Sequence, residues 1–261
     1  MMNTGFNFNG KKVIITGAAG VFGSWIVNAF YEVGADLWLI DQNETTLKEQ
    51  VYELTDKNDI KTSSFDLRHE QAIIEYFKDV KESWQYADIL INNAGIYPSS
   101  MLMDLDTTVW DDVMNINVRA PYLMSREFSK LLINENMPGS IVNIISKSAK
   151  VPRVGAVHYA MSKASLEMMT RGLSMELAPH GIRVNAVSPG FAPGSKTSYL
   201  SDDYIEAMCN KIPLGRTSGP NDAPQSILFL CSELASFITG TSLYVDGGNS
   251  AGDFNIPVIK N

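Results

Sequence analysis

Cysteine is scarce in this sequence of 261 residues, and Cys209 and Cys231 are the only two. Two thiols are too few for a disulfide scaffold, and neither lies in a Cys or His spacing that is typical of a metal site. A single disulfide between them is the alternative. We expect two reduced thiols and no bound metal.

The sequence also has no long apolar run and no excess of positive charge. No stretch approaches the roughly 18 apolar residues that indicate a membrane span, and residues 1–12 lack the apolar core of a signal peptide. The formal net charge is −8, whereas binding to a phosphate backbone needs a basic face. We therefore expect a cytoplasmic protein that binds neither membranes nor nucleic acid.

What the sequence does have is a regular alternation of short apolar runs with longer segments of helical periodicity. This alternation predicts an α/β fold of the doubly wound, Rossmann type, in which helices cover both faces of a parallel sheet. Segments 97–106 and 191–212 are irregular, but periodic structure resumes after each, so we expect one domain over residues 1–261. The expected strands are 12–15, 36–40, 61–65, 87–91, 139–145, 182–187 and 242–245, and the expected helices include 23–33, 70–80, 109–133, 159–178 and 223–230.

A glycine-rich segment, Thr16–Gly23, follows the first expected strand and opens directly into a helix. Glycines at such a junction permit a tight turn and let the backbone approach a pyrophosphate, which then rests on the helix N-terminus. Asp41 closes the second strand at about the spacing, roughly 20 residues, that dinucleotide-binding folds show. Its carboxylate is placed to accept hydrogen bonds from the adenosine ribose. The alternative is that Asp41 caps the following helix.

The residues around this segment also distinguish the two nicotinamide cofactors. A carboxylate at Asp41 repels the 2′-phosphate of NADP. No Lys or Arg occurs between Gly17 and Gly23, or at Gln42 and Asn43, to bind that phosphate. The sequence therefore favours NAD.

Tyr159 and Lys163 lie four residues apart at the start of a helical segment, so both side chains emerge on one face. A protonated lysine beside a phenol favours the phenolate. The phenol then serves as general base for alcohol oxidation or as general acid for carbonyl reduction. Such a pair alone is common on exposed helices, but Ser146, which ends an apolar run upstream, adds a third candidate.

Further motifs follow in order along the chain: Asp66, Asn92-Asn93-Ala94-Gly95, Asn117, Pro189-Gly190 and Asp246-Gly247-Gly248. Together with the glycine loop, Ser146 and Tyr159-x-x-x-Lys163, they make the sequence resemble the short-chain dehydrogenase/reductase family in its single-domain branch. The resemblance covers residues 10–248, which is nearly the whole chain. It implies a sheet of about seven strands, a nicotinamide cofactor and a homotetramer.

The resemblance implies four catalytic residues. Tyr159 is the acid/base, and Lys163 lowers the pKa of Tyr159 and binds the nicotinamide ribose. Ser146 hydrogen-bonds the substrate oxygen. Asn117 holds a relay water through its backbone.

The resemblance also implies a set of cofactor contacts. Within this set, Asp66 meets the adenine amine and residues 189–192 meet the carboxamide. The full set is Gly17, Gly20, Val21, Phe22, Gly23, Asp41, Asp66, Leu67, Asn93, Ala94, Gly95, Tyr159, Lys163, Pro189 and Ala192.

Three of these residues have a purely structural alternative. Ser146 would merely end a strand, Asn117 would be a satisfied buried amide, and Asp66 would cap the helix that begins near His69. Their joint occurrence in the family's order favours the functional interpretation.

Two positions depart from the single-domain pattern. Val21 stands where that branch has a glycine, and glycine occurs one position earlier, at Gly20, as in the extended branch of sugar-nucleotide epimerases. Too few residues follow Gly248 for the C-terminal substrate domain of that branch. Gly194 stands where a threonine often holds the carboxamide, and Ser195 or Thr197 is a candidate substitute.

The function that this resemblance implies is the interconversion of a secondary alcohol and a ketone, with a sugar acid or polyol as the first candidate substrate. A 3-oxoacyl-carrier-protein reductase is the rival within the enzyme class, although such enzymes mostly prefer NADP. A catalytically idle NAD-binding regulator is the alternative from another class. It needs a cofactor site but not the acid/base set.

Lys147, Lys150 and Arg153 place three cations between Ser146 and Tyr159. Such a rim, extended by Lys196 in the irregular segment, attracts an anionic substrate in an otherwise acidic protein. The alternative is that these are solvated loop charges or contacts between subunits. The Met- and Leu-rich segment 166–177 likewise suits either a helix–helix interface or the core.

Overall fold

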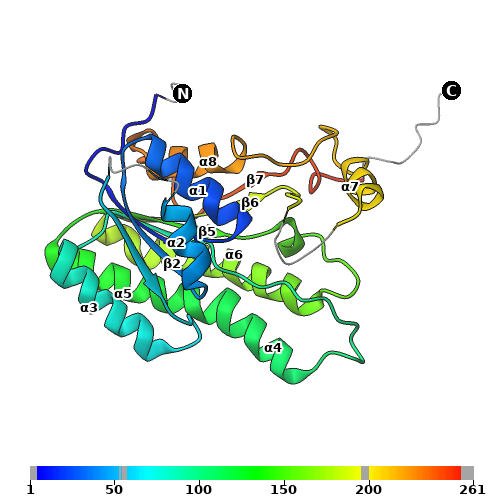
Figure 1. Cartoon of the computed structure of the whole chain (residues 1–261), viewed down its shortest axis with the longest axis horizontal. Helices are drawn as coiled ribbons and strands as arrows, with labels where there is room; N and C mark the ends of the chain where they lie inside the picture. Colours follow the sequence, from blue (N-terminus) through cyan, green and yellow to red (C-terminus); the bar gives the residue numbers. More distant parts are fainter. Residues whose placement is uncertain (1–4, 53, 55–57, 195–199, 254–261) are drawn as a thin grey trace.

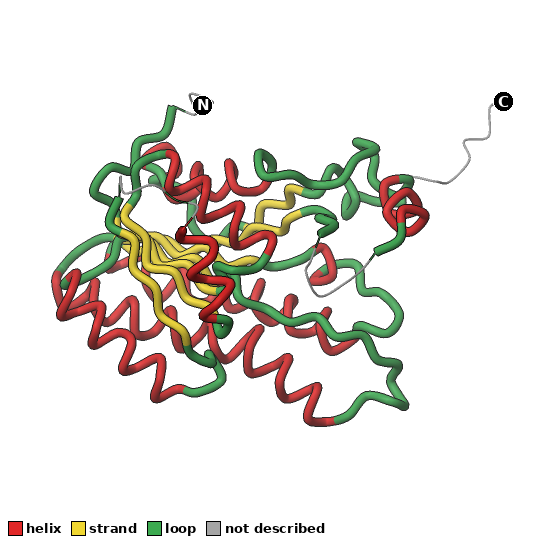
Figure 2. The backbone as a smooth tube through the Cα atoms, in the orientation of Figure 1, coloured by secondary structure: helices red, strands yellow, loops and turns green. Residues whose placement is uncertain are grey.

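The structure is a computed structural model that describes residues 5–52, 54, 58–194 and 200–253. Its centre is a seven-stranded parallel sheet with the order β3-β2-β1-β4-β5-β6-β7 (Figure 2). The strand order reverses at β1, as in doubly wound folds, so the predicted Rossmann-type fold is confirmed. The strands are β1 (Lys12–Thr16), β2 (Asp36–Asp41), β3 (Ile60–Ser64), β4 (Ile89–Asn92), β5 (Gly139–Ile144), β6 (Ile182–Pro189) and β7 (Ser242–Val245).

Helices cover both faces of the sheet (Figure 1). One layer holds α1, α2 and α8, and the other holds α3, α5 and α6, with α4 leading into α5. The short α7 lies apart from both layers, at the right of Figure 1. The bounds are α1 (Val21–Glu32), α2 (Glu44–Tyr52), α3 (Glu70–Trp84), α4 (Thr107–Met114), α5 (Ala120–Glu135), α6 (Val157–Leu177), α7 (Asp202–Cys209) and α8 (Ala223–Cys231).

The central strands are apolar on both faces because each face carries a helical layer. In β1, Val13 and Ile15 pack under α1 and α8, while Ile14 packs under α3 and α5, and all three are fully buried. The edge strand β3 differs, since its residues are only half-buried or exposed and include Lys61. A polar edge strand discourages pairing with another chain. The run expected to be apolar over 61–65 is therefore a largely polar edge strand, β3.

Two helical segments differ from the sequence prediction. The single helix expected over 109–133 is α4, a π-helical turn η1 (Asn115–Arg119) and α5 in succession. The segment 191–212, expected to be irregular, contains α7. The segment 97–106 has no helix or strand, as expected.

Both cysteines are free thiols, as expected. Cys231 is buried at the end of α8, and burial raises its pKa to about 12. Among the described residues no helix has the length and apolar character that crossing a membrane requires.

Candidate active site

The loop between β1 and α1 contains two glycines that the fold requires. Gly17 has a φ of +64°, and a Cβ atom on it would lie 2.7 Å from the Cα of Ala94. A Cβ on Gly23 would overlap the carbonyl oxygen of Gly17. Gly20 has a φ of −74°, and a Cβ there would make only an ordinary contact. Packing within the protein therefore fixes Gly17 and Gly23 but not Gly20.

The N-terminus of α1 faces this loop without a capping side chain. Gly20 is the N-cap residue, and no acidic residue occupies the first turn. The first-turn amides are therefore available to an anion. Val21 is the first residue of α1 and does not have a positive φ, so its departure from the family pattern causes no backbone strain. Phe22 packs edge-on against Trp25.

Asp41 reaches back from the end of β2 to the glycine loop. Its Oδ2 accepts a hydrogen bond from the amide of Ala19 at 3.1 Å, and its Oδ1 accepts one from the amide of Asn43 at 3.0 Å. The side chain of Asn43, rather than that of Asp41, accepts from the amide of Thr46 in α2. Within the described part of the chain Asp41 has no ion pair, so its negative charge is not neutralised beside the loop.

Asn93 clamps the end of β4 to the end of β1. Its Nδ2 donates to the carbonyl oxygens of Thr16 at 3.0 Å and of Gly17 at 2.9 Å. The hydroxyl of Thr16 accepts from the amides of Asn93 and Ala94 at 3.0 and 3.1 Å. The side chain of Asn93 is therefore used within the protein, where it shapes the glycine loop.

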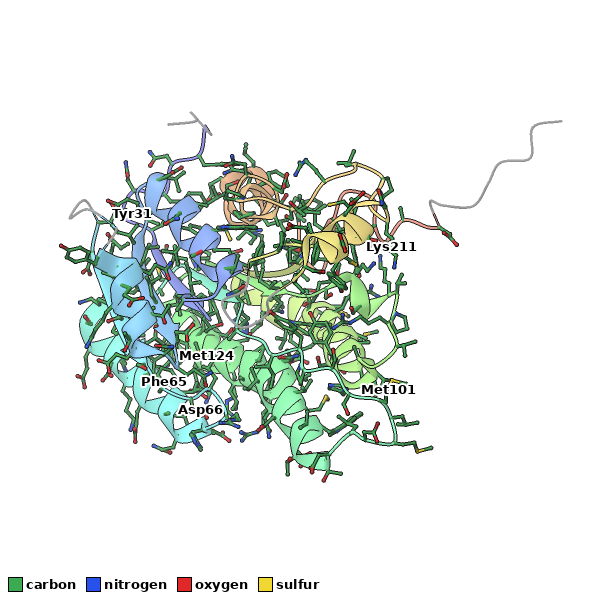
Figure 3. All side chains as sticks on the ribbon, turned by 45° about the vertical axis from the view of Figure 1, so that its right-hand side comes forward. Tyr31, Phe65, Asp66, Met101, Met124 and Lys211 are labelled. Atoms are coloured by element: carbon green, nitrogen blue, oxygen red, sulfur yellow. The ribbon has the colours of Figure 1, made fainter. Side chains whose placement is uncertain are left out.

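Asp66 follows β3, at the left of Figure 3, and pairs with Arg68 at 2.7 Å. A hydrogen bond from the Arg68 side chain lowers the pKa of this carboxyl group. Helix α3 has His69 as its N-cap residue and no side-chain cap, so the alternative role of Asp66 as a helix cap is wrong. Leu67 packs against the hydrophobic core beneath α3.

Tyr159 and Lys163 occupy the first two turns of α6, and Ser146 follows β5. The Nζ of Lys163 donates to the carbonyl oxygen of Ile144 at 2.7 Å and lies 5.9 Å from the centroid of the Tyr159 ring. The Ser146 hydroxyl accepts from the amide of Ser148 at 3.1 Å and lies close enough to the Tyr159 phenol to lower the pKa of that phenol. The three predicted catalytic side chains therefore lie together at the carboxyl edge of the sheet.

The electrostatics of this cluster differ for the two titrating groups. Burial raises the pKa of Tyr159, and the hydrogen bond with Ser146 and the charge of Arg153 act in the opposite direction. Burial lowers the pKa of Lys163 to about 8. The groups that lower the pKa of Tyr159 here are thus Ser146 and Arg153, and the effect expected of Lys163 stays a prediction.

Asn117 lies in the π-helical turn η1 and is fully buried. Its Oδ1 accepts from the amide of Ile96 at 2.9 Å, and its Nδ2 donates to the Ile96 carbonyl at 2.9 Å and to the Ser162 hydroxyl at 3.0 Å. The side chain is a satisfied amide that joins the loop after β4 to α6. The relay water at the backbone of Asn117 stays a prediction.

The segment after β6 lies beside the C-terminal Asp-Gly-Gly motif. A Cβ on Gly190 would lie 3.1 Å from the Cα of Asp246, so a side chain here would crowd the Asp246 backbone. Gly194 has a φ of +106°, a backbone conformation that disfavours the threonine of the family pattern. Ser195 and Thr197, the candidate substitutes, and Lys196 of the predicted rim lie outside the described residues.

Sequence reasoning missed two hydroxyl groups at the site, those of Thr16 and Ser162. The Thr16 hydroxyl accepts hydrogen bonds from the amides of Asn93 and Ala94. The Ser162 hydroxyl donates to the carbonyl oxygen of Tyr159 at 2.7 Å and accepts from the side chain of Asn117. Each directly precedes a singled-out residue, Gly17 and Lys163 respectively. That adjacency is the signal that could have found them.

Comparison with known proteins places this site in a family. The family model described as enoyl-(acyl carrier protein) reductase matches residues 17–250. The 3-oxoacyl-[acyl-carrier-protein] reductase of Chlamydia pneumoniae is 34% identical over 92% of this chain and 96% of its own length. The 5-keto-D-gluconate 5-reductase of Escherichia coli is 29% identical over 95% of this chain and 98% of its own.

A solved structure agrees with these relatives. A Beutenbergia cavernae protein, provisionally described as an NAD(P)-dependent gluconate 5-dehydrogenase and holding NADP at low occupancy, has a TM-score of 0.88 and 27% identity. The match covers 95% of this chain and 99% of that protein. The family model, the relatives and the fold agree with the motifs: the chain belongs to the short-chain dehydrogenase/reductase family of oxidoreductases, which use a nicotinamide cofactor.

Proposed function

We propose that this chain is an NAD-dependent oxidoreductase that interconverts a secondary alcohol and a ketone, with a sugar acid or polyol as substrate class. The observation that carries the proposal is the cluster of Ser146, Tyr159 and Lys163, in which Tyr159 lies one helical turn from buried Lys163 and close enough to Ser146 for that hydroxyl to lower its pKa. The relative named 5-keto-D-gluconate 5-reductase supports the substrate class.

In this proposal Tyr159 is the acid/base. Its phenol donates a proton to the carbonyl oxygen in reduction and takes one from the hydroxyl in oxidation. Ser146 donates a hydrogen bond to the same oxygen and so holds it at the phenol. The nicotinamide, when bound, supplies the hydride in reduction and accepts it in oxidation.

Lys163 and Asn117 support this acid/base group. A protonated Lys163 stabilises the phenolate of Tyr159 and hydrogen-bonds the ribose next to the nicotinamide. The backbone of Asn117 holds a water that relays the proton between Lys163 and solvent. In this reading one domain carries both the cofactor site and the acid/base set.

The glycine loop fits a dinucleotide, since α1 presents uncapped amides and the loop bends back at Gly17. We assign the pyrophosphate to these amides and the adenosine ribose to Asp41. The adenine is assigned to Asp66 and Leu67. The nicotinamide half is assigned to the backbone of Ala94 and Gly95 and to residues 189–192.

The preference for NAD rests on Asp41. Two of its lone pairs are used by the amides of Ala19 and Asn43, which leaves each oxygen one further site for a ribose hydroxyl. No cation neutralises this carboxylate within the described residues, and a 2′-phosphate placed beside it is repelled. NADP bound to the Beutenbergia protein makes the cofactor the first property to measure.

A second candidate function is the reduction of a 3-oxoacyl thioester, which the Chlamydia relative favours. Initial rates with a keto sugar acid and with an acetoacetyl thioester, each with NADH and with NADPH, separate the two. The proposal predicts the highest kcat/KM for the keto acid with NADH. A preference for the thioester with NADPH would assign the second function, and no turnover of either would favour a cofactor-binding regulator.

We also propose a homotetramer, supported by a stripe of exposed methionines on α6. Met161, Met168 and Met175 recur every seven residues with exposed fractions of 46%, 63% and 79%, while Leu166 on the opposite side is buried. An apolar stripe of this kind indicates a helix–helix interface. Light scattering of the purified protein measures the assembly. The cytoplasmic location stays a prediction.

A further inference from the structure

Two loops meet beside the candidate catalytic residues. The first lies between β4 and α4 (residues 95–106), and the second lies between β5 and α6 (residues 147–156). The amide of Ser100 in the first loop donates to the carbonyl oxygen of Gly155 in the second at 2.9 Å. Figure 3 shows Met101 of the first loop on the same side of the molecule as Lys211, away from Asp66.

The start of α6 holds the first loop against Tyr159. Buried His158 contacts the carbonyl oxygen of Pro98 through Nε2 at 3.0 Å. The Tyr97 ring lies edge-on to the Tyr159 ring, with 6.2 Å between the centroids. The two loops therefore form a wall that reaches the acid/base phenol.

Arg153 in the second loop is exposed, and its Nη2 donates to the hydroxyl of Ser99 at 3.2 Å. The chain has seven arginines, all within the described residues. Arg153 differs from the other six because it has neither a carboxylate nor a backbone carbonyl as partner in the described structure. The others bind such groups: Arg68, Arg119, Arg126, Arg171, Arg183 and Arg216.

The neighbouring cations of the predicted rim are engaged elsewhere. The Nζ of Lys147 donates to the Oδ1 of Asn249 at 2.9 Å. The Nζ of Lys150 lies 3.8 Å from the centroid of the Tyr244 ring. Both face the C-terminal segment, so among the described cations of the rim Arg153 is the one near the phenol. The charge of Arg153 acts on Tyr159, whose pKa it lowers.

We propose that Arg153 binds a carboxylate group of the substrate while the reacting oxygen of the same molecule lies at Ser146 and Tyr159. Arg153 thereby selects acids over neutral polyols. This inference rests on the proposed function. The hydrogen bond to the Ser99 hydroxyl uses only one N–H donor of the Arg153 guanidinium. The remaining N–H donors match a carboxylate in shape and charge. In a protein of net charge −8, a local cation at the mouth also attracts an anion that the rest of the surface repels.

The test compares gluconate with glucitol, which carries a hydroxymethyl group in place of the carboxylate. We measure kcat/KM for both with NAD⁺, at low and high salt, for the wild type and for Arg153→Ala. Arg153→Lys keeps the positive charge but removes the planar guanidinium that can bind both oxygens of a carboxylate. Arg171→Ala is the matched control, because it removes an exposed arginine on α6 that lies roughly 18 Å along the helix from Tyr159.

We expect Arg153→Ala to lower kcat/KM for gluconate by about 10- to 100-fold, the range for one charged hydrogen-bonded contact. Glucitol should change less than about twofold, Arg153→Lys should be intermediate, and Arg171→Ala should match the wild type. The preference of the wild type for gluconate should shrink as salt screens the charge. Equal losses for both substrates, or none, would overturn the role of Arg153 and leave the proposed oxidoreductase intact.

A binding measurement keeps the inference testable apart from turnover. Calorimetry with gluconate, in the presence of NADH, gives its Kd for the wild type and Arg153→Ala. We expect Arg153→Ala to raise Kd by about 10-fold or more. Equal Kd values, or no gluconate binding by either protein, would overturn the inference. Binding lost in Arg153→Ala, with no turnover by the wild type, would contradict the proposed function alone.

Discussion

The candidate cofactor residues lie at the ends of β1, β2 and β4, where hydrogen bonds between neighbouring strands hold them together. The candidate substrate wall, by contrast, consists of exposed loops. Asn93 and Asp41 each bind backbone groups of the glycine loop. By contrast, Leu102 and Met103 in the loop after β4 are 72% and 92% exposed. The candidate cofactor residues are thus tied to the sheet, while the candidate substrate wall lies in exposed loops.

This contrast explains why the family is easier to assign than the substrate. Strand ends and tight turns constrain residue types through backbone geometry, as the clash of a Cβ at Gly17 shows. Exposed loops impose few such constraints, and residues there reflect what they bind. Arg153, held only by Ser99, is an example. Four predictions test the two sides and the residues between them.

Tyr159 lies between the candidate cofactor residues and the candidate substrate wall, and removing its hydroxyl should have the largest effect on turnover. Tyr159→Phe keeps the ring but removes the proton that the reaction needs, so we expect turnover to fall by about 10²- to 10⁴-fold. NADH binding, followed by its fluorescence, should stay close to that of the wild type. Turnover near the wild-type rate would show that another group is the acid/base.

Lys163 should make stability depend on pH. Its pKa is lowered to about 8 in the folded protein, below the ordinary 10.5. Between these values the unfolded chain binds more protons, so the free energy of unfolding should rise with pH. Relative to Lys163→Met, the wild type should gain up to about 3 kcal/mol from pH 7 to pH 10. Urea unfolding without cofactor measures this, and parallel pH profiles would contradict it.

Two glycine variants test the cofactor side. Gly17→Ala adds a Cβ against Ala94 at a φ of +64°, so we expect a loss of about 1–3 kcal/mol in unfolding free energy. Gly20→Ala is the matched control, because its φ is negative and its Cβ has room, and stability should change little. Thermal unfolding compares them. Equal destabilisation would mean that the loop does not require Gly17 in particular.

Asp41→Ser tests cofactor choice and should have the smallest effect. The variant removes the repelling charge and one pair of ribose contacts, so kcat/KM for NAD⁺ should fall by about 10-fold. The value for NADP⁺ should rise, which narrows the gap between the cofactors. A wild type that uses both cofactors equally well would remove the basis of this assignment.

The sequence predicted the sheet and the glycine loop better than the segments between strands, for physical reasons. The glycine spacing and the apolar central strands are local signals: the glycine loop follows β1 as expected, and Asp41 ends β2. The π-helical turn at Asn117 was missed because its amide is bonded to Ile96 and Ser162, which are distant in sequence. Helix α7 was missed because it buries no residue, although its cap Ser201 was a readable signal.

The most direct test of the account is the rate of NADH formation by the wild-type protein with NAD⁺ and a panel of secondary alcohols that includes sugar acids and polyols. The account predicts saturable NADH formation with at least one hydroxy acid, and much slower formation with NADP⁺. Absence of NADH with every alcohol, or reaction with NADP⁺ alone, would contradict it.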